Sequence, residues 1–271
     1  MFGRVRRLVL IALVVLIVAW MPPAFAAQWY TLRVDKGNHP PQPVMDEVWK
    51  SIRVTGELFT RYKLILPEIV TIRVATTQES YARALMHYFN ASPAEAAQYA
   101  KLSAGMSSNS RPVVILNGHY ADGFASTLPH ELFHQAQRQL ATTSTPKWIT
   151  EGSAELFEKL ALHQAGKGVF VQYIQGVKGR LRQAGPLPSV AQVVTNWNAM
   201  FQQGKGGVIY NMATLMVWYL ADQQGFDGVV YYYQLIHQGV RPEDAFVTAF
   251  QVTPELFYQD FQAKLPQLIQ P

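Results

Sequence analysis

The chain of 271 residues contains no cysteine. This absence excludes disulfide bonds, thiolate nucleophiles, iron–sulfur clusters and every zinc site with a cysteine ligand. Charged residues are also scarce, at 15%, while 49% of the residues are hydrophobic, so general disorder is excluded and a buried core is expected. Any metal ion bound by this chain would therefore need histidine and carboxylate ligands.

The first 26 residues have the composition of an export signal. Three arginines precede 13 consecutive apolar residues at 8–20, and Pro22 and Pro23 are followed by Ala-Phe-Ala at 24–26. A basic start, an apolar run and an A-x-A cleavage pattern are typical of a secretory signal peptide, and the run is shorter than the roughly 20 residues that span a bilayer. We therefore expect an exported protein, periplasmic or secreted, that contacts the membrane only if this segment stays uncleaved.

The net charge of +5 depends strongly on this segment. Without its three arginines the chain has 20 basic and 18 acidic residues, a net charge of +2. No run of lysine or arginine longer than two residues follows the signal. Because nucleic-acid binding requires many basic contacts to phosphates, we expect no nucleic-acid partner.

Residue patterns predict an α+β fold with two parts. Alternating and β-branched residues predict strands at 28–34, 69–75 and 111–116, and apolar periodicity predicts helices at 44–62, 80–88 and 93–102. Beyond residue 127 the patterns are helical, at 127–141, 149–165, 189–195, 208–224, 227–238, 242–250 and 254–264. We place the boundary near residue 140, between an α+β part (27–140) and a helical part (141–271). The segment 176–206 is rich in glycine, glutamine and asparagine and is expected to contain a mobile loop.

The segment 130–134, His-Glu-Leu-Phe-His, has the spacing H-E-x-x-H. Residues four apart on a helix project at nearly the same angle, so His130 and His134 can bind one ion while Glu131 reaches a water on it. The alternative is a surface helix with two solvated histidines. Five apolar residues contradict that alternative, since they predict a mostly buried helix: Leu128, Leu132, Phe133, Ala136 and Leu140.

Two histidines need a third protein ligand to bind zinc tightly, with a fourth position left open for water. Glu151 follows His134 after 16 intervening residues and lies on a second predicted helix with an apolar face. Glu155 lies one turn later on the same face. Spacing alone therefore allows either glutamate to be the third ligand.

The two motifs together resemble the gluzincin zinc metallopeptidases of the peptidase-MA-like group. The matching residues are His130-Glu131-x-x-His134 followed by Trp148-x-x-Glu151-Gly-x-Ala-Glu155. The resemblance implies a zincin-like fold in which zinc is bound by His130, His134 and Glu151. It also implies that Glu131 is the general base, which takes a proton from a zinc-activated water and later passes it to the leaving amine.

The resemblance leaves Glu155 for a different role. Thermolysin-like members of the group carry an acid one turn after the ligand glutamate, and ligating histidines commonly donate their other ring N–H to a carboxylate. We therefore expect Glu155 to accept from His130 or His134, with His130 favoured. The alternative is an exposed Glu155 paired with Lys159 at i+4.

Two further segments correspond to parts of gluzincins. The segment 110–117 precedes the zinc helix, as the substrate-aligning edge strand does in that group, although an ordinary core strand is an equally good interpretation. Members of the group also place a tyrosine or histidine in the helical part, where it donates to the oxyanion. Tyr210 is expected to have this role here, and His237 is the alternative.

These features predict an exported zinc-dependent metallopeptidase that acts on a peptide or protein substrate. The alternative is a zinc-containing envelope protein that uses the same fold for binding or assembly without turnover. An intact Glu131 favours the enzyme, because a purely structural zinc site needs no base.

Overall fold

The computed structural model describes residues 29–34, 40–64, 66, 68–118, 124–141 and 144–270. The predicted export signal lies outside these residues. Helices predominate, and a four-stranded mixed sheet completes the α+β fold that the sequence predicts. No helix in the described part of the chain has both the length and the hydrophobicity needed to cross a membrane.

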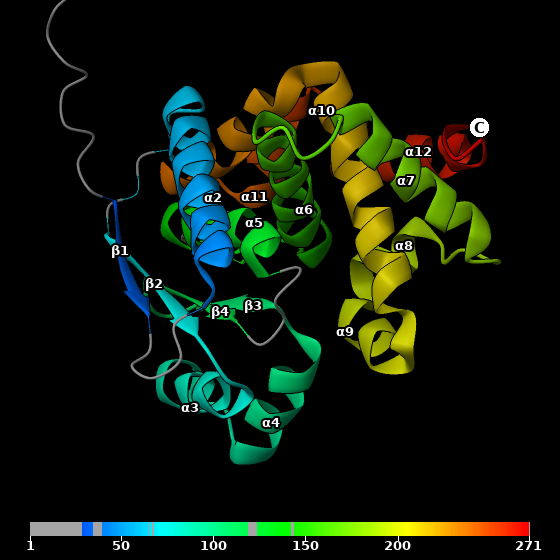
Figure 1. The fold of residues 1–271 in the computed structure, drawn as a ribbon. Coiled ribbons are helices and arrows are strands. Elements are labelled where there is room, and N and C mark those ends of the chain that lie inside the picture. The colour runs from blue at the N-terminus through cyan, green and yellow to red at the C-terminus, as the bar shows by residue number, and fades with distance from the viewer. Residues whose placement is uncertain are drawn as a thin grey trace, which may run out of the picture.

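The sheet consists of β1 (Tyr30–Val34), β2 (Val70–Ala75), β3 (Gly105–Ser107) and β4 (Val113–Asn117), in the order β1-β2-β4-β3. The strands β1, β2 and β4 are parallel, and β3 is antiparallel to β4. The helices α2 (Gln42–Arg61) and α5 (Phe124–Leu140) cover one face (Figure 1). The helices α3 (Gln78–Phe89) and α4 (Pro93–Leu102) cover the other.

The position of β4 corrects one expectation. Residues 110–117 are not an edge strand, because β4 pairs with β2 on one side and with β3 on the other. Its alternate residues pack against opposite layers, Val114 towards α5 and Ile115 towards α3 and α4, which explains its unbroken apolar sequence. The edge of the sheet beyond β4 is formed by β3, which the sequence analysis missed because three residues carry no detectable alternation.

The rest of the described chain is helical. Its elements are α6 (Lys147–Gln164), α7 (Phe170–Gln183), α8 (Val190–Thr195), α9 (Trp197–Met200), the π-helix η1 (Phe201–Lys205), α10 (Gly206–His237), α11 (Pro242–Phe250) and α12 (Pro254–Leu268). The segment 176–206, expected to contain a mobile loop, is mostly helical, with residues 184–189 as a connection. The helices predicted at 208–224 and 227–238 are joined as α10, which kinks at Gly225 (φ 71°).

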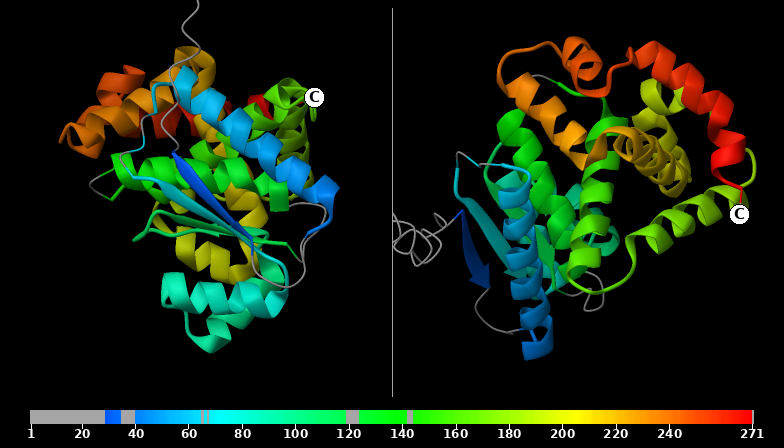
Figure 2. Two further views of the ribbon diagram at one scale, coloured as in Figure 1. Left: turned by 60° about the vertical axis from the view of Figure 1, so that its left-hand side comes forward. Right: turned by 90° about the horizontal axis from the view of Figure 1, so that it is seen from above.

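Two helices begin at the capping residues that the sequence predicts. Ser92 caps α4 and is followed by Pro93 in the first turn, and Thr253 caps α12 in the same way before Pro254. In the turned views, α6 and α10 lie at the centre of the helical layer (Figure 2). One hydrophobic cluster extends from the sheet through α5 and α6 to α12. This core continues across residue 140. The predicted boundary between two parts at that residue stays a prediction.

Gly152 permits the close approach of α6 to α10. A Cβ atom at this position would lie 2.4 Å from the carbonyl oxygen of Ala213 and 2.9 Å from a methyl group of Val217. No side chain larger than hydrogen fits there without moving one helix. This contact accounts for the glycine that directly follows Glu151.

Replacing Gly152 with alanine should therefore destabilise the fold by about 1–3 kcal/mol, the cost of overpacking, even though alanine favours helix formation. The measurement is the free energy of unfolding in urea. Gly179→Ala on α7 is the control, because a Cβ there would meet only the tip of Arg182 at 3.7 Å. The control should be neutral or stabilised by up to about 1 kcal/mol. A Gly152→Ala variant as stable as this control would contradict the described packing.

Candidate metal centre

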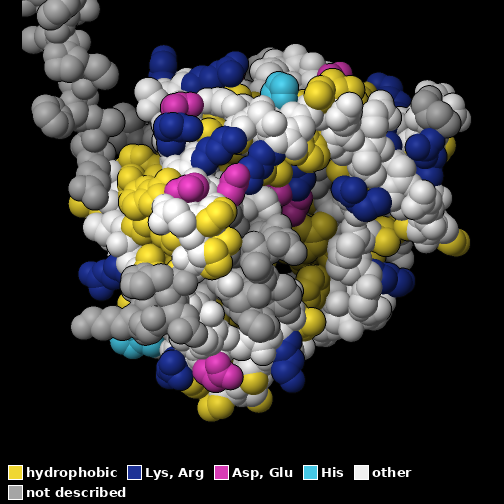
Figure 3. All heavy atoms as spheres, in the orientation of Figure 1, with side chains coloured by type: hydrophobic (Ala, Val, Ile, Leu, Met, Phe, Trp, Pro, Cys, Tyr) yellow, Lys and Arg dark blue, Asp and Glu magenta, His cyan; other side chains and the backbone are white. Residues whose placement is uncertain are grey.

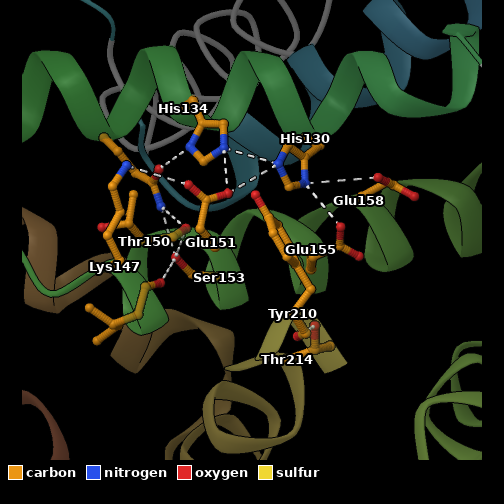
Figure 4. A network of polar contacts seen from close by, with 12 residues as sticks. His130, His134, Lys147, Thr150, Glu151, Ser153, Glu155, Glu158, Tyr210 and Thr214 are labelled. Carbon is orange, nitrogen blue, oxygen red and sulfur yellow. Dashed lines mark hydrogen bonds and ion pairs between the residues drawn. The ribbon is translucent and has the colours of Figure 1, made fainter. Parts of the chain in front are cut away.

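The candidate site lies between α5 and α6, which pack side by side (Figure 4). Helix α5 contributes His130, Glu131 and His134, and α6 contributes Glu151 and Glu155. The two imidazoles are one turn apart on α5, with ring centroids 4.6 Å apart, and both face α6. The apolar side of the same helix pair is held by Phe133, which stacks on Phe157 at 4.7 Å.

The three predicted ligands converge. The Nε2 atoms of His130 and His134 are 2.9 Å apart, and Oε2 of Glu151 lies 3.8 Å and 3.4 Å from them, respectively. A tetrahedral zinc ion with bonds of about 2.0–2.1 Å separates its ligand atoms by roughly 3.3 Å. The observed separations bracket this value, so the arrangement fits a tetrahedral ion of this size.

The outer nitrogens of the imidazoles support the same conclusion. Nδ1 of His134 lies 2.7 Å from the amide oxygen of Gln137, and Nδ1 of His130 faces the carboxylates of Glu155 and Glu158 at 3.6 Å and 3.9 Å. The Gln137 oxygen only accepts, so Nδ1 of His134 carries the ring proton and its Nε2 presents a lone pair to His130. Nδ1 of His130 is buried and has no hydrogen-bond partner. The two Nε2 atoms are 2.9 Å apart, so either a proton on Nε2 of His130 or a cation lies between them.

In the absence of a metal, the surroundings of His130 favour its protonated form. Burial lowers its pKa, but the Glu151 carboxylate, 3.8 Å away, and the charges of three other glutamates outweigh burial and raise the pKa to about 9. Burial also acts against the charge of Glu151, yet the two histidines hold its pKa well below the usual range. The centre is therefore built to hold positive charge.

Glu131 lies beside the three ligands without belonging to them. Burial raises its pKa, against the lowering effect of the two histidines and of the Ser107 backbone N–H that donates to it. A Cβ at Gly105 would lie 3.3 Å from Cγ of Glu131, so β3 passes directly beside this carboxylate. A buried carboxylate with a raised pKa has the properties of a general base.

Tyr210 reaches the centre from the first two turns of α10. Its side chain points towards the glutamates of α6 (Figure 4). Burial is the largest cause that raises the pKa of Tyr210. Glu151 raises this pKa further, because its carboxylate is negatively charged and accepts a hydrogen bond from the Tyr210 hydroxyl. His237, by contrast, is exposed at the last residue of α10. The geometry favours Tyr210 over His237, and the oxyanion role stays a prediction.

Glu155 lies between the two partners that the sequence analysis considered. One of its oxygens lies 3.6 Å from Nδ1 of His130, too far for a hydrogen bond, and the other lies 3.6 Å from Nζ of Lys159. Its role as an acceptor for His130 stays a prediction. Glu158, a third glutamate that the sequence analysis missed, also faces His130 and pairs closely with Lys159. Its position seven residues after Glu151 was a usable signal, because i, i+4 and i+7 lie on one helix face.

Among the residues that the structure describes, two sets of ligand atoms are close enough to hold an ion. The first set is His130, His134 and Glu151, and the second is His130, Glu155 and Glu158. Lys159 pairs with both carboxylates of the second set, so its single positive charge already offsets half of their negative charge. The first set has two nitrogens and one carboxylate oxygen, a ligand group that suits zinc and leaves a position open.

Comparisons of the chain with models of protein families, with curated proteins and with solved structures find no match. The relationship to gluzincins therefore remains an interpretation of the two motifs. Three features of the structure bear on function: the centre between α5 and α6, the edge strand β3 beside Glu131, and Tyr210.

Proposed function

We propose that this protein is a zinc-dependent hydrolase that cleaves peptide bonds. The observation that carries the proposal is the convergence of His130, His134 and Glu151 beside a buried carboxylate, Glu131, that is not needed as a ligand. Zinc bound by the three ligands would lower the pKa of a water molecule and polarise a carbonyl group. The gluzincin relationship, the zincin-like fold and the exported location belong to the same proposal and are supported by the sequence motifs.

Glu131 would act as the proton acceptor. Burial raises the pKa of Glu131. Glu131 therefore holds a proton more readily than an exposed glutamate would, as a general base at neutral pH must. The Ser107 N–H orients one carboxylate oxygen. The proton taken from water would then pass from this carboxylate to the departing amine.

Tyr210 would stabilise the negative charge that develops on the carbonyl oxygen. Burial raises its pKa, so the hydroxyl is protonated at neutral pH and can donate a hydrogen bond. Donors placed at a developing oxyanion are worth more in a buried site than in water.

The edge strand favours a peptide as the substrate. No described strand pairs with the outer side of β3, so an extended chain could add to the sheet there by backbone hydrogen bonds, except at the Ser107 N–H, which already donates to Glu131. Such a chain would pass beside Glu131. Seen as spheres, this face of the molecule is hollowed near its middle, with acidic and basic side chains grouped above the hollow (Figure 3).

Glu131→Gln should retain zinc and lose hydrolysis by about 10²- to 10⁴-fold, since an amide cannot accept the proton. The measurements are metal content and cleavage of a peptide library with and without a chelator. His134→Ala is the matched control and should lose zinc as well as activity. A Glu131→Gln protein that cleaves at the wild-type rate contradicts the mechanism, and a zinc-bound wild type that cleaves nothing favours the alternative of a binding protein.

Tyr210→Phe should lower kcat by about 10- to 1000-fold with little change in KM, because the lost donor acts on the transition state. Tyr219→Phe, on the same helix, is the control. Its hydroxyl bonds to Asp260 and Lys264 rather than to the centre, so kcat should stay at the wild-type value. An unchanged kcat in Tyr210→Phe would remove this residue from the mechanism and favour His237.

Zinc binding should depend on pH because of His130. The metal-free imidazole is protonated below a pKa of about 9, and zinc requires the neutral form, so below that pH each ion bound displaces a proton. The affinity should therefore rise with pH, by up to about tenfold per unit, and level off above the pKa. Calorimetry at pH 7 in buffers of different ionisation enthalpy should find about one proton released per ion. If no proton is released when zinc binds at pH 7, His130 is not protonated in the metal-free protein, and the expected charge of the centre is wrong.

A further inference from the structure

Gln137 lies one turn beyond His134 on α5 and is buried between α5, α6 and α10. Its amide oxygen is 2.7 Å from Nδ1 of His134. Its amide nitrogen is 2.8 Å from the carbonyl oxygen of Thr150, 2.8 Å from Oγ of Ser153 and 3.0 Å from the hydroxyl of Tyr233. Residues from all three helices thus meet at one amide.

The Thr150 carbonyl determines which way this amide points. A carbonyl oxygen only accepts, so it must face the NH₂ group of Gln137 and not its oxygen. The amide oxygen is then directed at His134, and an oxygen can only accept there as well. Nδ1 of His134 must therefore carry the ring proton, which leaves the lone pair on Nε2, the atom that faces His130 and Glu151.

The surroundings hold the amide in this orientation. Ser153, fully buried, donates to the carbonyl oxygen of Ile149, and its Oγ is 3.0 Å from the Tyr233 hydroxyl. Tyr233 itself is 1% exposed and lies 3.3 Å from the same Ile149 oxygen. Rotation of the Gln137 amide would break contacts on α6 and α10 together.

We propose that Gln137 is a positioning residue for the metal ligand His134: it fixes the ring proton on Nδ1 and directs Nε2 at the ion. The inference rests on the proposed metal centre but not on hydrolysis. It also makes the two histidines unequal, because Nδ1 of His134 donates to an amide oxygen at 2.7 Å, while Nδ1 of His130 has no hydrogen-bond partner and lies 3.6 Å and 3.9 Å from two carboxylates.

The test compares Gln137→Met with Gln135→Met. Gln135 is a second fully buried glutamine on α5, but its amide bonds to Ser107, Ser108 and Val113 rather than to a ligand. Both variants should lose stability. Only Gln137→Met should weaken zinc and cobalt binding, by about 10- to 100-fold in Kd, the usual effect of losing such a partner. Equal Kd values in the wild type and Gln137→Met, or an equal loss in Gln135→Met, would overturn the inference.

Nitrogen NMR of the histidine rings gives a second measurement that does not require a variant to fold. In zinc-loaded wild type, His134 should carry its proton on Nδ1, and that proton should be protected from exchange with water. A proton on Nε2 in the wild type would overturn the inference, and so would wild-type protein that binds neither metal. Zinc binding with the expected Nδ1 proton but no hydrolysis of any peptide would overturn the proposed function alone.

Discussion

The packing of α5 against α6 brings the histidines and glutamates of the candidate centre together. The two helices meet through an apolar side, where Phe133 stacks on Phe157, and a polar side, where the histidines of α5 face the glutamates of α6. The apolar contacts set the relative position of the helices, and the polar groups meet because they lie on the adjoining faces. The close contact of α6 with α10 at Gly152 then determines how near Tyr210 comes to Glu151.

This arrangement concentrates negative charge in a buried place, which is costly unless each charge is balanced. Lys159 pairs with both Glu155 and Glu158 and offsets one of their two charges, and Lys147 lies 3.7 Å from Glu151. His130, with its raised pKa, adds a further positive charge when no metal is bound. A divalent ion at the centre would replace this proton, so the charges that stabilise the metal-free protein are the ones that favour metal uptake.

Part of the centre could be predicted because it is local in sequence. The spacing of His130 and His134 places both on one face of any helix, and the same holds for Glu151 and Glu155. The helices themselves were predictable from apolar periodicity and from caps such as Ser92 and Thr253. Most strands and helices therefore appear close to their expected bounds, while the segment 176–206 differs because short helices with exposed polar residues resemble loops in composition.

Helical spacing alone predicts that His130 and His134 share one face and that Glu151 and Glu155 share another, because residues four apart project at nearly the same angle. The meeting of the two faces, and what surrounds them, depends on tertiary packing. β3 passes beside Glu131, Tyr233 holds Gln137 from a position 96 residues away, and Tyr210 rather than His237 points at the glutamates of α6. Each of these contacts joins segments that no local pattern relates, because their distance depends on how the sheet and three helices pack around a common core.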